Sequence, residues 1–116
     1  MEVPLFREAI AVSADDGTGV ARAVAMMGPE KYGDMWRVNL MTSTSDSTTD
    51  VQLRVYRNIE SPGAMIDSTY AGKQATSPCD YWLRTGEKVV AVWSKGDIGA
   101  HMSIRLEGTI YSGRQG

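Results

Sequence analysis

The sequence predicts an all-β fold: a single-domain antiparallel β-sandwich, of jelly-roll or Ig-like kind, with seven to eight short strands. Three observations support this prediction. The 12 glycines, together with many serines and threonines, are typical of a turn-rich β protein. Short segments in which apolar and polar residues alternate recur along the chain, separated by turn residues. A chain of 116 residues, 42% of them hydrophobic, suits one domain with one core.

The strongest strand signals lie near the C-terminus. Residues 87–94 are almost continuously apolar and β-branched, which indicates a strand buried on both faces. Residues 101–107 alternate between apolar and polar side chains, which predicts a half-buried strand. Because residues 95–100 between them supply glycines and an aspartate, we expect a central hairpin against which the rest of the chain packs.

The N-terminal residues 1–7 are expected to form an arm, because Pro4 interrupts regular strand pairing. Two large apolar residues in it, Leu5 and Phe6, have two possible roles. They either cover the open end of the domain's own core or dock onto a neighbouring subunit. Residues 8–13 then predict the first strand of the sandwich, with its larger apolar side chains on one face.

A turn at residues 15–19 leads into a second predicted strand over residues 19–27, where alanines alternate with larger side chains. A short helix is the alternative, because Ala, Arg and Met favour helices, but the flanking glycines leave little length for one. The alanine face of the strand is thin. Either another element packs closely on it, or it faces solvent.

Residues 35–44 and 51–57 predict two alternating strands around a polar loop, and therefore a second hairpin. Residues 58–78 are the least regular part of the chain, and long loops in compact domains are often functional. Short strands are expected there at residues 68–71 and afterwards at 80–84.

The end of the chain completes the predicted domain organisation. Gly108 interrupts the last strand pattern and predicts a bulge or bend. The sandwich is expected to span residues 8–111, and residues 112–116 are expected to form a flexible tail.

Charge and composition narrow the function classes. The net charge is −2 and the basic residues are scattered singly, which argues against a nucleic-acid partner or an anionic membrane surface. The sequence contains no run of about 18 apolar residues, so it predicts no transmembrane span. The N-terminus lacks the pattern of a secretory signal, so we expect folding in a cytoplasm.

No stretch of the sequence is typical of a catalytic centre, and we expect a non-enzymatic protein without a cofactor. His101 is the single histidine, and no Gly-x-Ser-x-Gly motif accompanies it. The single Cys79 excludes an internal disulfide and is expected to be buried or half-buried. An oxygen-ligand calcium site at Asp15, Asp16 or Asp97 is a remaining alternative, although no Asp-x-Asp-x-Asp-Gly spacing is present.

Large apolar and aromatic residues outside the expected core are candidates for binding a partner. Trp36 and Trp93 lie in apolar strand patterns and are expected in the core. Tyr81 and Trp82 follow the irregular segment and are the better candidates for a surface that binds a protein or a glycan. The complete set of candidate interface residues is Leu5, Phe6, Met65, Ile66, Tyr70, Tyr81 and Trp82.

Several motifs together resemble a known family. The two most specific are Asp67-Ser68-Thr69-Tyr70-Ala71-Gly72 and the turn from Trp93 through Gly96-Asp97-Ile98-Gly99-Ala100; the others are residues 36–38, 55–58, 61–62, 66, 86–87 and 91–92. In this order they are similar to small virion-associated proteins of tailed bacteriophages of actinobacteria, over about residues 19–108. Lys95 departs from the pattern, in which a glycine or another small residue is expected.

The resemblance implies a β-sandwich that is a structural part of the virion, on the tail or the capsid, and it supplies no catalytic residues. The expected partners are copies of the protein and other virion proteins, and the expected location is the virion, assembled in the host cytoplasm. The alternative is a β-sandwich module that binds a carbohydrate or a host receptor through exposed aromatic residues.

Overall fold

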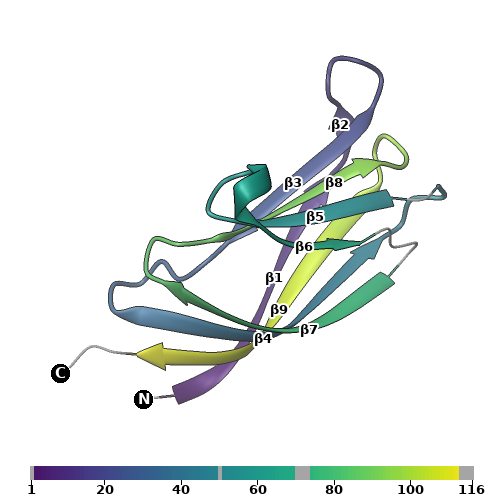
Figure 1. The fold of residues 1–116 in the computed structure, drawn as a ribbon. Coiled ribbons are helices and arrows are strands. Elements are labelled where there is room, and N and C mark those ends of the chain that lie inside the picture. The colour runs from purple at the N-terminus through teal and green to yellow at the C-terminus, as the bar shows by residue number, and fades with distance from the viewer. Residues whose placement is uncertain (1, 50, 70–73, 113–116) are drawn as a thin grey trace.

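The computed structural model describes residues 2–49, 51–69 and 74–112, and most of them belong to β-strands (Figure 1). Among these residues, no helix is long and apolar enough to cross a membrane. The elements are β1 (Glu2–Val12), β2 (Ala14–Asp15), β3 (Ala21–Met27), β4 (Asp34–Ser45), β5 (Val51–Arg57), the 3₁₀ turn η1 (Pro62–Ala64), β6 (Met65–Thr69), β7 (Gln74–Arg84), β8 (Val89–Lys95) and β9 (His101–Ser112).

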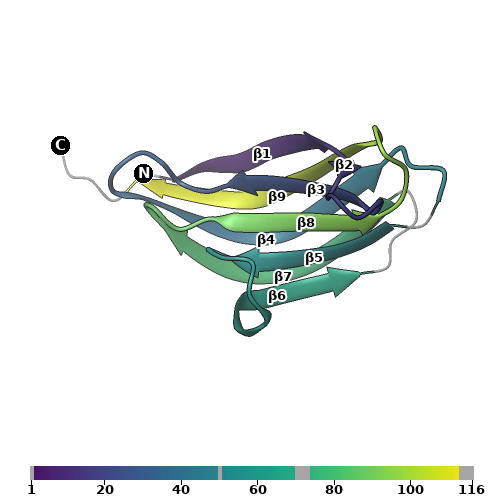
Figure 2. The ribbon, with the colours of Figure 1, turned by 90° about the horizontal axis from the view of Figure 1, so that it is seen from above.

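The strands form two antiparallel sheets packed face to face, so the predicted β-sandwich is confirmed (Figures 1 and 2). We call the sheet with the strand order β1-β9-β4-β7 the front sheet and the sheet with the order β2-β3-β8-β5-β6 the back sheet; the back sheet is the nearer of the two in Figure 2. Strands far apart in sequence pair in a nested series: β1 with β9, β3 with β8, β4 with β7, and β5 with β6. This nesting is the topology of a jelly roll.

The core lies between the inward faces of the two sheets. Trp36 and Trp93 are 6% and 2% exposed, which confirms their predicted place in the core. Cys79 is half-buried, as predicted, and its sulfur lies 3.5 Å from the carbonyl oxygen of Val38. The largest fully buried side chains are those of Trp93, Leu83, Met102, Ile104, Leu106, Val38, Val55 and Val89.

The thin alanine face of β3 points into the core. Ala21, Ala23 and Ala25 are all buried, while Met26 on the opposite side of the strand is exposed. The strand that packs across from β3 is β1, which belongs to the other sheet. Its own inward residues include alanines packed against the core, so small side chains on both strands let the two sheets approach closely here.

Both predicted hairpins are wrong in their pairing, although their strands exist. β8 and β9 lie in different sheets, and so do β4 and β5. Each polar connection therefore carries the chain across the sandwich. Gly96 and Gly99, at φ 79° and 89°, supply the backbone reversal after β8, and a reversal of this kind serves an inter-sheet crossing as well as a hairpin. Lys95 also has a positive φ, 66°, where glycine is favoured.

The predicted N-terminal arm is also corrected. From Glu2 onward it is the first part of β1, paired with β9 without a register shift, and Pro4 is accommodated because β1 is an edge strand. At the other end of the chain, Ser112 is the last residue of β9, and the rest of the expected tail lies outside the described residues.

The predicted irregularity at Gly108 is present, but the bulge is on the neighbouring strand. β9 runs unbroken through Gly108, while β4 shifts register between Val38 and Leu40. The alternation of β4 therefore reverses at this point, and Met41 is buried while Leu40 is only half-buried. The irregular residues 58–78 hold η1, all of β6 and the first part of β7, which is longer than the predicted strand at 80–84.

Candidate interaction surfaces

The residues predicted to form a partner surface do not lie together. Leu5 is 2% exposed and points from β1 into the core, which agrees with the first of its two predicted roles, and its selection as a partner-surface residue is wrong. Phe6, Met65 and Trp82 are exposed, at 58%, 45% and 40%. Phe6 and Trp82 lie on the outer face of the front sheet, and Met65 lies on the outer face of the back sheet. Tyr70 lies outside the described residues.

The other two candidates, Ile66 and Tyr81, are half-buried and pack against the core. The Tyr81 hydroxyl donates a hydrogen bond to the Ile66 carbonyl oxygen, with an O–O distance of 2.7 Å. This bond connects β6 of the back sheet with β7 of the front sheet at their shared margin. Both residues therefore hold the two sheets together in this structure.

A row of exposed apolar side chains follows the outer face of β1. Phe6, Ile10 and Val12 are 58%, 65% and 54% exposed, and we call these three residues the β1 stripe. The guanidinium of Arg105, on the neighbouring strand β9, lies 5.1 Å from the centre of the Phe6 ring. A cation at this distance is attracted to the face of the ring.

The sequence correctly places Ile10 and Val12 on one face of a strand, but that face points to solvent. The inward positions are taken by Ala9 and Ala11, which pack against the core where β1 and β3 approach closely. Because large apolar side chains usually face the core, side-chain size alone predicts the opposite orientation, with Ile10 and Val12 inward. The signal that identifies the outward face is the presence of alanines at alternate positions in both strands, because two such faces fit a narrow gap.

A second apolar row crosses the outer face of the back sheet. Cross-strand pairing aligns Met26, Val90, Tyr56 and Met65 on β3, β8, β5 and β6, and we call these four residues the methionine row. The two central residues are buried, at 5% and 7% exposure, while the methionines at its ends are exposed, at 55% and 45%. Methionine surfaces adapt readily to the shape of a partner.

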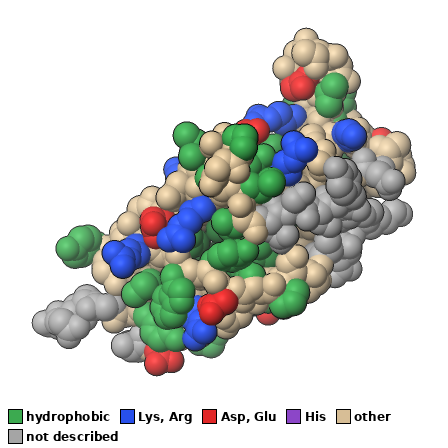
Figure 3. Space-filling model, in the orientation of Figure 1, with side chains coloured by type: hydrophobic (Ala, Val, Ile, Leu, Met, Phe, Trp, Pro, Cys, Tyr) green, Lys and Arg blue, Asp and Glu red, His purple; other side chains and the backbone are tan. Residues whose placement is uncertain are grey.

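The segment between β5 and β6 lies beside the methionine row. An ion pair between Arg22 and Glu60 connects this segment to β3, and Ile59 within it is 64% exposed. In Figure 3, hydrophobic side chains gather around this part of the molecule, with charged side chains beside them. The outer side of the back sheet therefore carries exposed apolar side chains at Met26, Ile59 and Met65, with the Arg22–Glu60 ion pair on the same side.

A cluster of aromatic and charged side chains occupies the other edge of the front sheet. The rings of Trp82 and Tyr111 stack with their centres 5.4 Å apart and their planes at 25°. The guanidinium of Arg37 lies 5.3 Å from the centre of the Trp82 ring. Arg37 also donates two hydrogen bonds to the carboxylate of Asp80, at 2.9 and 3.2 Å. These hydrogen bonds lower the pKa of Asp80 and raise that of Arg37, so the pair remains charged.

The crossing after β8 is held by the carboxylate of Asp97. It accepts hydrogen bonds from the backbone N–H and hydroxyl of Thr48, both at 2.6 Å, and from the hydroxyl of Thr49 at 3.2 Å. The Asp97 N–H in turn donates to the Ser47 hydroxyl at 2.9 Å. These bonds join the connection between β4 and β5 to the connection between β8 and β9. Asp97, which belongs to one of the two most specific motifs of the resemblance, therefore has a structural role.

The pKa of Asp97 is lowered from its ordinary value of 3.8, chiefly by the Thr48 hydroxyl and backbone N–H. A carboxylate with a depressed folded-state pKa stabilises the fold above its unfolded pKa, and that contribution is lost as the pH falls through the folded pKa. We therefore expect Asp97→Asn to lower the melting temperature at pH 7, with the difference from wild type shrinking as the pH falls below about 4. Thermal unfolding followed by circular dichroism measures this.

The matched control for Asp97 is Glu30→Gln, which alters an exposed carboxylate that makes no hydrogen bond to another described residue. Its melting temperature should follow that of the wild type across the same pH range. A melting-temperature deficit in Asp97→Asn that stays constant from pH 7 to pH 3 would show that the charge of Asp97 is not the stabilising feature.

His101 lies in a shallow hollow of about 440 Å³ on the outer face of the front sheet. Its Nδ1 is 3.2 Å from the carboxylate of Asp46, and its backbone N–H donates to the same carboxylate. Ser103 also lines the hollow, but its hydroxyl is hydrogen-bonded to Thr44. Within the described part of the chain, no serine hydroxyl is hydrogen-bonded to the imidazole.

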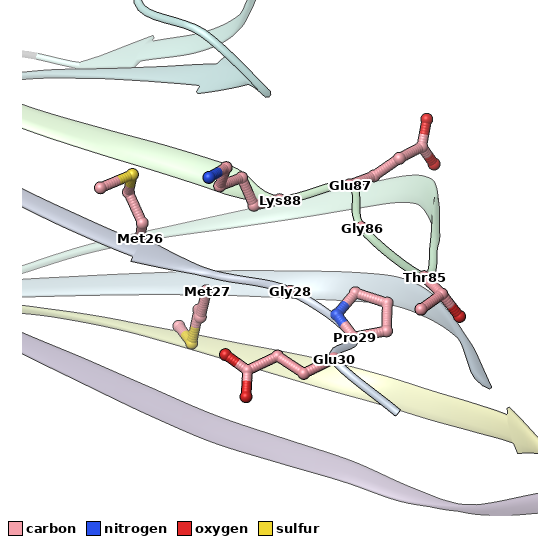
Figure 4. A pocket seen from close by; sticks show the side chains of 9 residues that line it. All are labelled: Met26, Met27, Gly28, Pro29, Glu30, Thr85, Gly86, Glu87 and Lys88. Atoms are coloured by element: carbon pink, nitrogen blue, oxygen red, sulfur yellow. The ribbon is translucent and has the colours of Figure 1, made fainter. Parts of the chain in front are cut away.

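Another hollow, of about 400 Å³, lies between residues 26–30 and 85–88 at one end of the sandwich (Figure 4). The Glu87 side chain points away from it in this view. That carboxylate accepts hydrogen bonds from the Arg84 backbone N–H and from Arg57, which together lower its pKa. The lining combines methionine and backbone surface with the charges of Glu30 and Lys88, and it brings together no acid–base pair.

The carboxylates considered for calcium are engaged in turns. Asp15 accepts hydrogen bonds from the N–H groups of Gly17 and Gly19, at 3.2 and 2.7 Å. Asp16 accepts them from the backbone and hydroxyl of Thr18, which lowers its pKa. In residues 2–49, 51–69 and 74–112, no group of three or more His, Cys, Asp or Glu side chains is placed to hold a metal ion.

Comparison with known proteins adds little. No protein-family model matches the chain, and no curated protein matches it. Among solved structures, the chain is similar to one described as a family two carbohydrate esterase from Cellvibrio japonicus, with 10% identity and a TM-score of 0.33. The match covers 99% of this chain and 35% of that protein, so the chain spans about a third of its length. Similarity at this level supports no argument about activity.

Proposed function

We propose that the protein is a non-enzymatic structural component of a bacteriophage virion, which acts by assembling with copies of itself and with other tail or capsid proteins. The observation that carries the proposal is the exposure of apolar side chains on both outer faces of the sandwich. The β1 stripe lies on the front sheet, and the exposed ends of the methionine row lie on the back sheet.

Contiguous exposed apolar areas mark sites of protein contact, because an isolated soluble domain gains by burying them. A module that binds one receptor needs one such area. A subunit placed between neighbours uses areas on opposite sides, and the β1 stripe and the methionine row are on opposite sides of the two packed sheets. This arrangement favours assembly over the binding of a single receptor.

The phage assignment depends on the sequence resemblance, and the fold is compatible with it. Jelly rolls occur in viral capsid domains and also in lectins, so the fold allows both candidate functions, and this support is an analogy at the level of the fold. The proposed location is accordingly the virion, assembled in the host cytoplasm, on either the capsid or the tail.

The test is mass spectrometry of purified particles from the phage that encodes the protein. We expect the protein in the particles at a constant ratio to the major structural proteins. We also expect the double variant Ile10→Glu/Met26→Glu, which places a charge on each apolar area, to fold but to be depleted from particles. A wild-type protein that is absent from purified particles would contradict the proposal.

A second candidate function, glycan binding, is favoured by the Trp82–Tyr111 pair. The apolar C–H face of a pyranose packs on an aromatic ring, and its hydroxyls need polar partners such as the neighbouring Arg37 and Asp80. Because Arg37 already lies over the Trp82 ring, a sugar would share or displace that contact.

If the aromatic cluster binds a glycan, Trp82→Ala should lower the affinity at least tenfold, since the stacking surface is lost. A glycan array identifies the ligand, and titration calorimetry then compares the variants. The control is Tyr32→Ala, which removes an aromatic residue that is 90% exposed elsewhere on the surface. Equal binding by both variants, or no array signal from the wild type, would exclude this function.

A further inference from the structure

We infer that β1 pairs antiparallel with β1 of a second copy, so that two front sheets join into one continuous sheet across a two-fold axis. The inference specifies one self-contact of the proposed assembly and rests on that proposal. It is derived from the free edge of β1, the side chains beside that edge, and the charges that select a register.

The first argument is that β1 is a long, regular and open sheet edge. It has 11 residues, about 35 Å at the rise of an antiparallel strand, and within the described residues it pairs only with β9. Figure 2 shows it along one margin of the molecule. Open strand edges present unpaired N–H and C=O groups that readily pair with another chain.

The other sheet edges are less suited to pairing. β6 has five residues, and its register with β5 shifts. β7 borders the irregular part of β4 and carries the exposed Pro78 within its length, which removes an N–H donor. The edge of β3 is partly occupied, because the two-residue strand β2 pairs with the first two residues of β3. β1 keeps one register with β9 from Glu2 to Val12, and its proline lies near its start.

The second argument comes from the side chains. The β1 stripe lies directly on the open strand, with Phe6, Ile10 and Val12 each more than half exposed. In a symmetric β1–β1′ pair, the same strand supplies both halves of the contact, so the stripe of one copy continues into the stripe of the other. Such a two-fold contact closes on itself and yields a defined dimer.

The third argument selects the register. In a continuous sheet, residues that pair across the joint point to the same face of the sheet. The outward residues of β1 are even-numbered, so even-numbered positions of one copy pair with even-numbered positions of the other. The pairing centred on Glu8 places two like charges opposite each other, which is unfavourable. The next allowed register toward the apolar end is centred on Ala9. It places Phe6 opposite Val12 of the second copy, and Ile10 opposite Glu8 of the second copy.

This register makes a charge test possible at Ile10. Ile10→Glu places a carboxylate opposite Glu8 of the other copy, twice per dimer, and should raise the dimer dissociation constant at least about tenfold. Ile10→Lys places an ammonium at the same positions, so it should retain dimer. Sedimentation velocity over a concentration series measures both variants, with circular dichroism to show that each is folded.

The matched control is Tyr32→Glu, a charge at an exposed aromatic residue outside both the β1 stripe and the methionine row, which should leave the dimer unchanged. A covalent test checks the register. In a Cys79→Ser background, the double variant Phe6→Cys/Val12→Cys should form a disulfide-linked dimer on oxidation, whereas Phe6→Cys alone should not.

A wild-type protein that remains monomeric at all concentrations would overturn the inference. So would a dimer that Tyr32→Glu disrupts and Ile10→Glu does not, or a dimer in which the double-cysteine variant fails to cross-link. Mass spectrometry of purified particles distinguishes failure of the β1 pairing from failure of the proposed virion function. A monomeric protein found in virions contradicts only the β1 pairing, whereas a dimeric protein absent from virions contradicts only the virion function.

Discussion

Replacing Trp93 by alanine is expected to lower the free energy of unfolding by about 3–5 kcal/mol, the range for a fully buried large aromatic residue. Trp93 is 2% exposed and is the largest of the fully buried side chains. It lies on the inward face of β8, the central strand of the back sheet, so its removal leaves a cavity that the neighbouring strands cannot close. Urea denaturation, analysed by linear extrapolation, measures the loss.

The control for Trp93 is Trp82→Ala, which removes the same side chain from the surface. Trp82 is 40% exposed, and its loss should cost about 1 kcal/mol, from the ring contacts with Tyr111 and Arg37. Similar unfolding free energies for the two variants would mean that the core is not organised around Trp93. With a total stability of about 5–15 kcal/mol for a domain of this kind, Trp93→Ala removes a large fraction of it.

The second large effect is expected at Gly108, where alanine should destabilise the fold by about 3 kcal/mol, at the upper end of the overpacking range. A Cβ atom at this position would lie 1.9 Å from the Arg37 carbonyl oxygen and 3.1 Å from the Asn39 backbone nitrogen. These are backbone atoms of the β4 bulge, so they cannot move aside as a flexible side chain would. The bulge or the β4–β9 pairing must change instead.

Gly63→Ala is the matched control for Gly108, because nothing lies within 4 Å of a Cβ built on Gly63. Its unfolding free energy should stay within about 0.5 kcal/mol of the wild type. Denaturation of the two variants side by side therefore separates a steric effect from the general cost of removing a glycine. An equally stable Gly108→Ala variant would show that β4 is not bulged toward β9 at this point.

The candidate interaction residues show how far sequence patterns reach. Exposure of Phe6 and Trp82 agrees with their selection as surface residues, whereas Leu5, one position away from Phe6, is in the core. A strand places neighbouring side chains on opposite faces, so in a strand of a two-sheet sandwich one of two adjacent residues faces the core and cannot lie on the outer surface. Selecting both therefore required that at least one be wrong.

By itself, the sequence determined most of the strands, the β-sandwich and the core tryptophans, because alternation of apolar and polar residues is a local property with a period of two. The tertiary structure alone decided which sheet each strand joins, since the same turn glycines serve a hairpin and a crossing between sheets. It also decided that Ala9 and Ala11 face inward and Ile10 outward. That choice depends on the width of the gap between β1 and β3, two strands in different sheets, and no local pattern measures it.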